Sequence, residues 1–327
     1  MKILIVSANL IPVVNYGGSE RVIWYLGREL SKLGHKVSYL VAKGSVCDFA
    51  DVYFYNPDEP FEKQIPGEFD VIHFNDYSPK DFEIPYITTQ HGTIKTQYDL
   101  DKNTVFVSKD HAARYDSDQF VYNGLDWDDY GPADLNNKRN YFHFLGKAAW
   151  RVKNFKGAKK IILNTPKETL AVLGGNRIEW SRRFKITISP RIKFYGMVGG
   201  EKKLQLISGS KGLVFPIRWN EPFGLAMTES LYFGCPVFGT PYGSLPEIIK
   251  EDVGFLSNKS EELSKAIKNA EFFSKKRCHE YARDCFNSKQ MALGYIEKYN
   301  VVMSGKNLNA VSPRLREVQI GRFLPWD

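Results

Sequence analysis

The stretch from Gly212 to Ile249 constrains the fold more than any other part of the chain. Its apolar run Leu213–Ile217 is typical of a buried strand. A polar break follows, and helix-forming residues then extend from Gly224 to Gly234, where a glycine commonly ends a helix. The next segment, Pro236–Thr240, predicts a second strand. Strand, loop, helix and strand in this order are the repeating unit of a parallel α/β sheet.

The loop of this unit is the predicted ligand site, because ligands of open parallel sheets bind beyond the carboxyl ends of the strands. A helix that begins at Phe223 and Gly224 directs free backbone N–H groups and a positive dipole end toward such a ligand. Glycine also lets a phosphate approach the backbone closely. Glu221 and Glu229 flank this anion site, and carboxylates are good acceptors for sugar hydroxyls. The pattern suits a molecule with a sugar, a diphosphate and a ribose in series.

The run from Glu221 to Glu229, which reads EPFGLAMTE, resembles the E-x7-E motif of retaining GT-B glycosyltransferases of the family 4 type, also called glycosyl transferases group 1. Two further segments, PVFGT from Pro236 and GSLPE from Gly243, match the same family. The resemblance covers nearly the whole chain up to about residue 300. For the first motif alone, an ordinary strand–helix unit with two solvated glutamates is the alternative.

The resemblance implies an α/β chain with the GT-B fold, in which two doubly wound, Rossmann-like domains face each other across a cleft. Residues 1–135 are expected to form an N-terminal, acceptor-side domain, and residues 136–290 a C-terminal, nucleotide-sugar-binding domain. Residues 291–327 are expected to supply a crossing helix and a basic tail that return to the N-terminal domain. A length of 327 residues agrees with two domains, and the polar segment Asp134–Asn140 is the predicted linker.

The implied reaction is the transfer of a hexosyl group from a UDP- or GDP-sugar to an acceptor hydroxyl, with retention of the anomeric configuration. Glycan, lipopolysaccharide or glycolipid assembly is the expected setting. The catalytic residues implied are His91, Lys147, Lys156 and Glu221. Glu221 would hold hydroxyls of the transferred sugar, and the two lysines would neutralise the leaving diphosphate. Retention follows from the family alone, since no residue stands out as a covalent nucleophile.

The cationic residues depart from the family's usual pattern in two ways. Lys147 replaces the usual arginine after Gly146, and lysine is a point charge rather than a bidentate fork. The gap to the Lys156–Gly157 pair is also a few residues longer than usual. Lys156 is preferred as the diphosphate ligand because a glycine follows it, and Arg151 and Lys153 remain alternatives.

The resemblance also assigns nucleotide-sugar binding to residues near the strand ends and helix starts. Glu229 would accept from ribose hydroxyls, and backbone groups after a strand end would meet the base. A pair of glycines near the N-terminus would approach the donor phosphates or the acceptor, with a flexible turn as the alternative explanation. The set comprises Gly17, Gly18, Lys153, Met197, Val198, Phe223, Gly224, Leu225 and Glu229.

Polar residues also follow predicted strands in the N-terminal half. His91 comes after the apolar segment Ile84–Thr89 and precedes Gly92. In the family, a histidine at this place contacts the transferred sugar; a hydrogen-bonded histidine at the edge of the core is the alternative. His73 and Asp76 would either orient the acceptor or cap a strand end.

Composition limits the class of protein without choosing the substrate. The net charge of +8 favours anionic partners such as nucleotide diphosphates, membrane surfaces or nucleic acids. Four cysteines without zinc spacing indicate reduced core residues, and we expect a cytoplasmic protein without a cofactor or metal. The Asp126-Trp-Asp128 segment is interpreted as a turn, not a metal site. Peripheral contact with the inner face of the membrane stays open, as does the oligomeric state.

Three alternative functions stay open. The first is a glycosyltransferase that acts on a modified nucleic-acid base, which the basic tail would suit. The second is a nucleotide-sugar epimerase or hydrolase of the same fold, and the third is a non-catalytic scaffold. The donor base, the sugar and the acceptor are not specified, and we expect loops such as Ile11–Tyr16 and Asp76–Phe82 to determine them.

Overall fold

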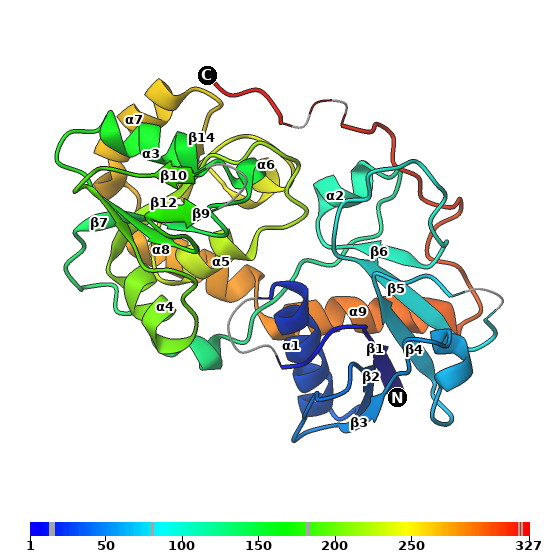
Figure 1. Cartoon of the computed structure of the whole chain (residues 1–327). Coiled ribbons are helices and arrows are strands. Elements are labelled where there is room, and N and C mark those ends of the chain that lie inside the picture. Colours follow the sequence, from blue (N-terminus) through cyan, green and yellow to red (C-terminus); the bar gives the residue numbers. More distant parts are fainter. Residues whose placement is uncertain (13–16, 80–81, 181–183, 320, 322) are drawn as a thin grey trace. The chain divides into compact units, whose positions relative to one another are not determined.

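The structure is a computed structural model that describes residues 1–12, 17–79, 82–180, 184–319, 321 and 323–327. The chain forms two compact units (Figure 1). The first comprises the described residues up to Trp127 together with Phe286–Gln319. The second comprises Asp128–Cys285 and the described residues after Gln319. The chain therefore leaves the first unit after residue 127 and returns to it at residue 286.

The first unit contains a six-stranded sheet in the order β3-β2-β1-β4-β5-β6, with all neighbouring strands parallel. Its strands are β1 (Lys2–Val6), β2 (Lys36–Val41), β3 (Asp51–Phe54), β4 (Val71–Asn75), β5 (Tyr86–Gln90) and β6 (Thr104–Phe106). Its helices are α1 (Ser19–Lys32), η1 (Phe61–Gln64), α2 (Lys109–Ala113) and α9 (Ser288–Met303). This is a doubly wound sheet whose order reverses between β1 and β4.

Two segments from the C-terminal part of the chain complete the first unit. Helix α9 packs against α1 and β5, and Tyr295 and Tyr299 bury their rings there. The basic segment that follows α9 buries Leu315 and forms ion pairs from Arg314 to Asp99 and from Arg316 to Asp116. Arg322, the last arginine of the tail, lies outside the described residues.

The second unit contains a six-stranded parallel sheet in the order β11-β8-β7-β12-β13-β14, and a two-stranded antiparallel ribbon. Its strands are β7 (Tyr141–Leu145), β8 (Leu170–Leu173), β9 (Ile178–Trp180), β10 (Phe184–Ile186), β11 (Ile192–Phe194), β12 (Ser210–Phe215), β13 (Val237–Gly239) and β14 (Gly254–Leu256). Its helices are η3 (Arg151–Lys153), α3 (Phe155–Leu163), α4 (Gly200–Ser208), α5 (Leu225–Tyr232), α6 (Leu245–Ile248), α7 (Ser260–Lys268), η4 (Ala270–Phe272) and α8 (Lys275–Cys285); η2 (Trp127–Tyr130) spans the boundary.

The strand–loop–helix–strand unit predicted from Gly212–Ile249 is β12-α5-β13. Gly212 fits there because a Cβ atom would lie 2.9 Å from both the Phe238 ring and the Pro236 carbonyl oxygen. Gly234 ends α5 with a φ of +70°. The predicted doubly wound α/β class is confirmed for both units. The segment after β14 divides into α7, η4 and α8, and Phe273, between η4 and α8, packs against the core.

Candidate active site

Most of the predicted site residues lie at one edge of the second unit's sheet. Lys147 follows β7, Met197 follows β11 and Glu221 follows β12, so all three lie beyond carboxyl ends of parallel strands. Ligands of open parallel sheets bind at this edge. His91 belongs to the first unit.

Helix α5 begins without a side-chain cap. Gly224 precedes it with φ +88° and ψ +66°, a left-handed conformation that favours glycine. A Cβ atom there would lie 2.7 Å from the Met227 methyl carbon and 3.2 Å from Glu221 Cγ. Phe223 is buried, whereas Gly224 and Leu225 are partly exposed. The helix thus presents an accessible N-terminal backbone, as an anion site requires.

Glu221 is a buried carboxylate with two donors on the same oxygen. Lys153 Nζ lies 2.5 Å from Glu221 Oε2, and Trp219 Nε1 donates to that oxygen at 3.0 Å. Lys153 Nζ also lies 5.1 Å from the centre of the Trp219 ring and 5.2 Å from that of Phe215. Glu221 is 7% exposed and Lys153 9% exposed, so the charges are paired away from bulk water.

The backbone of Glu221 is held by the segment after β13. Ser244 donates its N–H to the Glu221 carbonyl at 2.9 Å and its hydroxyl to the Phe223 carbonyl at 2.7 Å. Gly243 has φ +61°, and a Cβ atom there would lie 2.3 Å from Glu221 N. The glycine and serine of the GSLPE segment therefore fix the loop that carries Glu221.

Glu229 lies on the first turns of α5 and is 2% exposed. Its Oε1 accepts a hydrogen bond from the Tyr130 hydroxyl at 2.7 Å, and Lys203 Nζ of α4 lies 2.5 Å from the same oxygen. Lys203 Nζ also lies 5.5 Å from the centre of the Tyr130 ring. Neither partner was predicted from the sequence, because Tyr130 and Lys203 stand 99 and 26 residues away from Glu229 in the chain.

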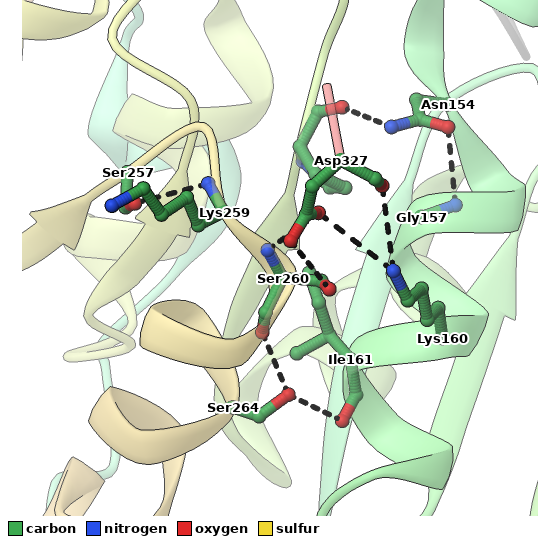
Figure 2. A network of polar contacts seen from close by, with 10 residues as sticks. Asn154, Gly157, Lys160, Ile161, Ser257, Lys259, Ser260, Ser264 and Asp327 are labelled. Carbon is green, nitrogen blue, oxygen red and sulfur yellow. Dashed lines mark hydrogen bonds and ion pairs between the residues drawn. The ribbon is translucent and has the colours of Figure 1, made fainter.

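The three lysines of the predicted diphosphate site differ in their surroundings. Lys153 is buried against Glu221, whereas Lys147 and Lys156 are exposed. Lys147 Nζ lies 5.4 Å from the centre of the Trp150 ring. The glycine after Lys156 has a local explanation (Figure 2): Asn154 caps α3 by accepting from the Gly157 N–H at 3.1 Å, and a Cβ at Gly157 would lie 2.3 Å from Asn154 Nδ2.

The predicted base-binding residues follow β11. Gly196 turns the chain with φ +71°, and its carbonyl accepts from the Gly174 N–H at 2.7 Å. Met197 is 46% exposed and Val198 is half-buried just before α4. Because Met197 is exposed beside this turn, its side chain and backbone are accessible to the ring of a nucleobase.

In the first unit, His91 follows β5 and is half-buried. Its Nε2 is hydrogen-bonded to Asn75 Oδ1 at 2.8 Å, and its backbone N–H donates to Asp76 Oδ1 at 2.8 Å. Burial lowers the pKa of His91 below its ordinary value, while Asp76 and Glu20 oppose that shift. The ring is consequently neutral at pH 7.

The second of the paired glycines before α1 does not need unusual backbone angles. Gly18 has φ −81° and ψ −59°, which any residue adopts, and the Gly17 carbonyl accepts from Arg21 Nε at 2.9 Å. Gly17 is buried and Gly18 is exposed. Neighbouring residues 13–16 of one predicted specificity loop, and 80–81 of the other, lie outside the described residues.

Two other polar candidates of the first unit have structural partners. His73 is buried between the Tyr299 hydroxyl at 2.8 Å and Thr89 Oγ1 at 2.7 Å, and burial lowers its pKa to about 3. Asp126 lies 2.9 Å from Lys32 Nζ and 2.8 Å from Arg28 Nη2. Over the part of the chain that the structure describes, no group of three or more His, Cys, Asp or Glu residues could hold a metal ion.

No helix among the described residues combines the length and the hydropathy that crossing a membrane requires. The exposed arginines of the tail that are described, Arg314 and Arg316, face acidic side chains of the first unit.

Comparisons with known proteins agree with this geometry. Residues 129–284 match the family model described as glycosyl transferases group 1. A curated relative, an uncharacterised 41.2 kDa protein in the cps region of Klebsiella pneumoniae, is 27% identical over 115 residues, which are 33% of this chain and 32% of the relative. The chain therefore spans about a third of that relative's length.

Solved structures share the fold at low sequence identity. AviGT4, a glycosyltransferase involved in avilamycin A biosynthesis, is 21% identical with a TM-score of 0.78, over 93% of this chain and 98% of that one. HepE of Anabaena, in complex with UDP and glucose, is 14% identical with a TM-score of 0.62, over 92% and 99% of the two chains. The predicted Rossmann-like architecture of two α/β domains, as in GT-B enzymes, is confirmed. The part of the chain that matches the glycosyl transferases group 1 model, residues 129–284, is the part that carries Glu221, Glu229 and their lysine partners.

Proposed function

We propose that this protein is a retaining glycosyltransferase that moves a hexosyl group from a UDP- or GDP-sugar to an acceptor hydroxyl. One observation carries the proposal: two buried carboxylates, Glu221 and Glu229, stand on either side of the uncapped start of α5, and each is held by a lysine. A diphosphate fits the helix start, and hydroxyl-bearing groups fit the two carboxylates. The match of residues 129–284 to the group 1 family model and the UDP and glucose in the HepE structure support the same donor class.

The leaving diphosphate would lie against the N-terminus of α5. Negative charge grows on the diphosphate as the bond to the sugar breaks, and preorganised N–H groups and cations stabilise that charge. Lys153 is the preferred cation because its ammonium group already lies beside Glu221. Lys147 and Lys156, exposed near the same edge, would supply longer-range positive charge.

The carboxylates would hold the two sugars of the donor. Glu221 would accept from hydroxyls of the transferred hexose, with Lys153 and Trp219 fixing its orientation. Glu229 would accept from the ribose hydroxyls, and the turn at Met197 and Val198 would contact the base. Phe223, Gly224 and Leu225 would line the phosphate position between them.

The first unit would contribute neutral groups. His91, neutral at pH 7, would donate or accept a hydrogen bond at a hydroxyl of the transferred sugar. Gly17 and Gly18 would contact the donor phosphates or the acceptor at the start of α1. A glycan or lipid-linked acceptor is the proposed partner, and the relative from a cps region supports glycan assembly. A cytoplasmic location with peripheral membrane contact belongs to the same proposal.

The test begins with nucleotide binding. Isothermal calorimetry with UDP and GDP should give at least one micromolar complex, and Glu229→Ala should weaken it. Glu221→Ala should mainly lower turnover. Wild-type affinity in Glu229→Ala would contradict the ribose role, and Glu251→Ala, an exposed glutamate of the same unit, is the matched control.

Product analysis then separates transfer from the alternatives. With the donor alone, a transferase should leave nearly all of the nucleotide sugar intact, whereas an epimerase or hydrolase should consume it. With a mixture of glycan acceptors, a new glycoside of unchanged anomeric configuration should form. Rapid conversion of the donor without any acceptor would overturn the transferase proposal.

A further inference from the structure

The last described residues, Phe323–Asp327, lie against the loops that carry the candidate active site. Arg218 Nε donates to the Leu324 carbonyl at 2.8 Å, and the Leu324 N–H donates to the Arg218 carbonyl at 2.9 Å. The Tyr242 hydroxyl donates to the Pro325 carbonyl at 2.8 Å. Arg218 follows β12 and Tyr242 follows β13, so the segment runs along the edge where the site lies.

The end of this segment is anchored on two helices (Figure 2). Asp327 Oδ1 accepts from the Ser260 N–H at 2.8 Å, and Oδ2 accepts from the Ser260 hydroxyl at 3.2 Å, at the start of α7. Lys160 of α3 donates to the Asp327 carbonyl at 3.4 Å. Trp326 packs against the hydrophobic core beneath. An acidic side chain at a helix N-terminus is favourable, so the anchor is a stabilising one.

The ring of Phe323 contacts two arginines from two different loops. The centre of its ring lies 4.7 Å from Arg151 Cζ and 5.2 Å from Arg218 Cζ. An aromatic face attracts each guanidinium, whereas two guanidiniums repel one another. Arg151 opens the short helix that ends at Lys153, and Arg218 stands three residues before Glu221.

The same two loops are joined by a backbone hydrogen bond. The Arg218 N–H donates to the Val152 carbonyl at 2.7 Å, and Asn154 Nδ2 donates to the Pro216 carbonyl at 2.8 Å. Lys153, which pairs with Glu221, stands between Val152 and Asn154 in the chain. Phe323 therefore contacts both loops, the one that carries Lys153 and the one that leads to Glu221. The separation of these loops sets the position of the Lys153–Glu221 pair.

We propose that the segment Phe323–Asp327 is a positioning strap for the nucleotide-sugar site, and that Phe323 is its positioning residue. The strap rests on the proposed function for its ligand, a nucleoside diphosphate sugar. Without the ring, mutual repulsion separates Arg151 and Arg218, the link between the loops loosens, and Lys153 and Glu221 lose their fixed spacing. Affinity for the diphosphate then falls.

The first experiment measures the mobility of the two loops without any ligand. Amide hydrogen exchange of the full chain is compared among the wild type, Phe323→Ala, Phe323→Tyr and Phe272→Ala, which removes an 81% exposed phenylalanine of the same unit. Phe323→Ala should accelerate exchange in residues 151–154 and 216–221. Phe323→Tyr keeps the aromatic face and should resemble the wild type, as should Phe272→Ala.

Unchanged exchange in Phe323→Ala overturns the proposal that the segment is a strap. If Phe323→Ala fails to fold, Phe323→Leu, which keeps apolar volume without the ring, takes its place.

The second experiment titrates UDP and GDP into the same proteins. Phe323→Ala should bind the preferred nucleotide about fivefold to tenfold more weakly, as expected for the loss of two cation–π contacts. Phe323→Tyr should restore the wild-type affinity. Faster loop exchange with unchanged nucleotide affinity overturns the positioning role. If the wild type binds neither nucleotide, the proposed function fails, while the exchange experiment still decides whether the strap holds the loops.

Discussion

The two units have the same winding but use their sheet edges differently. Each has six parallel strands with one reversal of order, and each places a buried histidine between sheet and helix. His73 in β4 bonds to Tyr299 of α9, and His143 in β7 bonds to Ser230 of α5 at 2.8 Å and to Ser210 at 2.7 Å. In both units, a neutral histidine in a strand is hydrogen-bonded to a hydroxyl group of a helix.

The difference lies in charge. The carboxyl edge of the second sheet buries two Lys–Glu pairs, whereas the corresponding edge of the first carries His91 against the Asn75 amide. Buried ion pairs are often no more stabilising than apolar side chains of the same volume. The two buried pairs therefore need an explanation other than stability, and the proposed nucleotide-sugar site in the second unit would supply one.

The largest effect is expected from a variant that breaks one of the two Lys–Glu pairs. Lys153→Ala leaves Glu221 buried without its cation and should lower the free energy of unfolding by about 3–5 kcal/mol. Turnover should fall about 100-fold or more, because the loss of one preorganised charge contact costs that much. Urea denaturation and initial rates with the donor measure both.

Lys156→Ala is the matched control, since it removes an exposed lysine three residues away. Its stability should change by less than about 0.5 kcal/mol. Equal losses of turnover in the two variants would remove the preference for Lys153. The double variant Lys153→Met, Glu221→Leu should recover stability without recovering activity.

The second prediction concerns acid, and it should affect both units, through two histidines in the first and one in the second. Burial lowers the pKa of His73, His111 and His143 to about 3 from an ordinary value of 6.5. Each ring stays neutral in the folded chain but takes up a proton in the unfolded chain below that ordinary value. Stability is therefore fully present above pH 6.5 and should fall by about 1.4 kcal/mol per pH unit per histidine as the pH drops toward 3.

Chemical denaturation at a series of pH values measures this slope. His73→Gln should remove one histidine's contribution to the pH slope for unfolding of the first unit. His143→Gln should do the same for the second unit. A slope that is identical in wild type and both variants would show that these rings do not titrate on unfolding.

The third prediction contrasts two glycines that precede helices. Gly224→Ala should cost about 1–3 kcal/mol, because φ is +88° and a Cβ atom would crowd Met227. Gly18→Ala should be neutral or stabilise by up to about 1 kcal/mol, because its φ of −81° suits alanine. Thermal melts of the two variants test the contrast, and equal destabilisation would contradict it.

The smallest effect concerns the second ion pair. Tyr130→Phe removes the hydroxyl that donates to Glu229 and leaves the ring beside Lys203. The loss of one hydrogen bond should cost about 1 kcal/mol, or about fivefold in nucleotide affinity. Calorimetry measures it, with Tyr53→Phe on the exposed strand β3 as the control. A greater loss of turnover than of affinity would place Tyr130 nearer the reaction than the ribose.

The sequence predicted much of the local structure around the site. The apolar run before Glu221, the glycines at 224 and 234, and the spacing of the two glutamates were enough to locate β12, α5 and the loop between them. Local chemistry determines these features, because turn residues and helix ends follow from neighbours in the chain.

Long-range pairing could not be predicted in the same way. The partners of Glu229 come from η2 and α4, and that of Glu221 from η3, so only the folded sheet brings them together. Gly157 favoured Lys156 in the sequence, but the structure explains that glycine by the Asn154 cap. The Phe323–Asp327 strap was likewise absent from the prediction, since its contacts with Arg218 and Ser260 lie far along the chain.

The position of Lys203 has a consequence for protein engineering. It stands six residues after Met197, on the helix that directly follows the proposed base-binding turn, and its ammonium group reaches Glu229. Libraries that alter residues 197–199 to change nucleotide preference would therefore shift the proposed ribose contact as well. Selections for a new donor should randomise 197–199, 203 and 229 together, because single-site screens would discard variants whose gain depends on a second, compensating change.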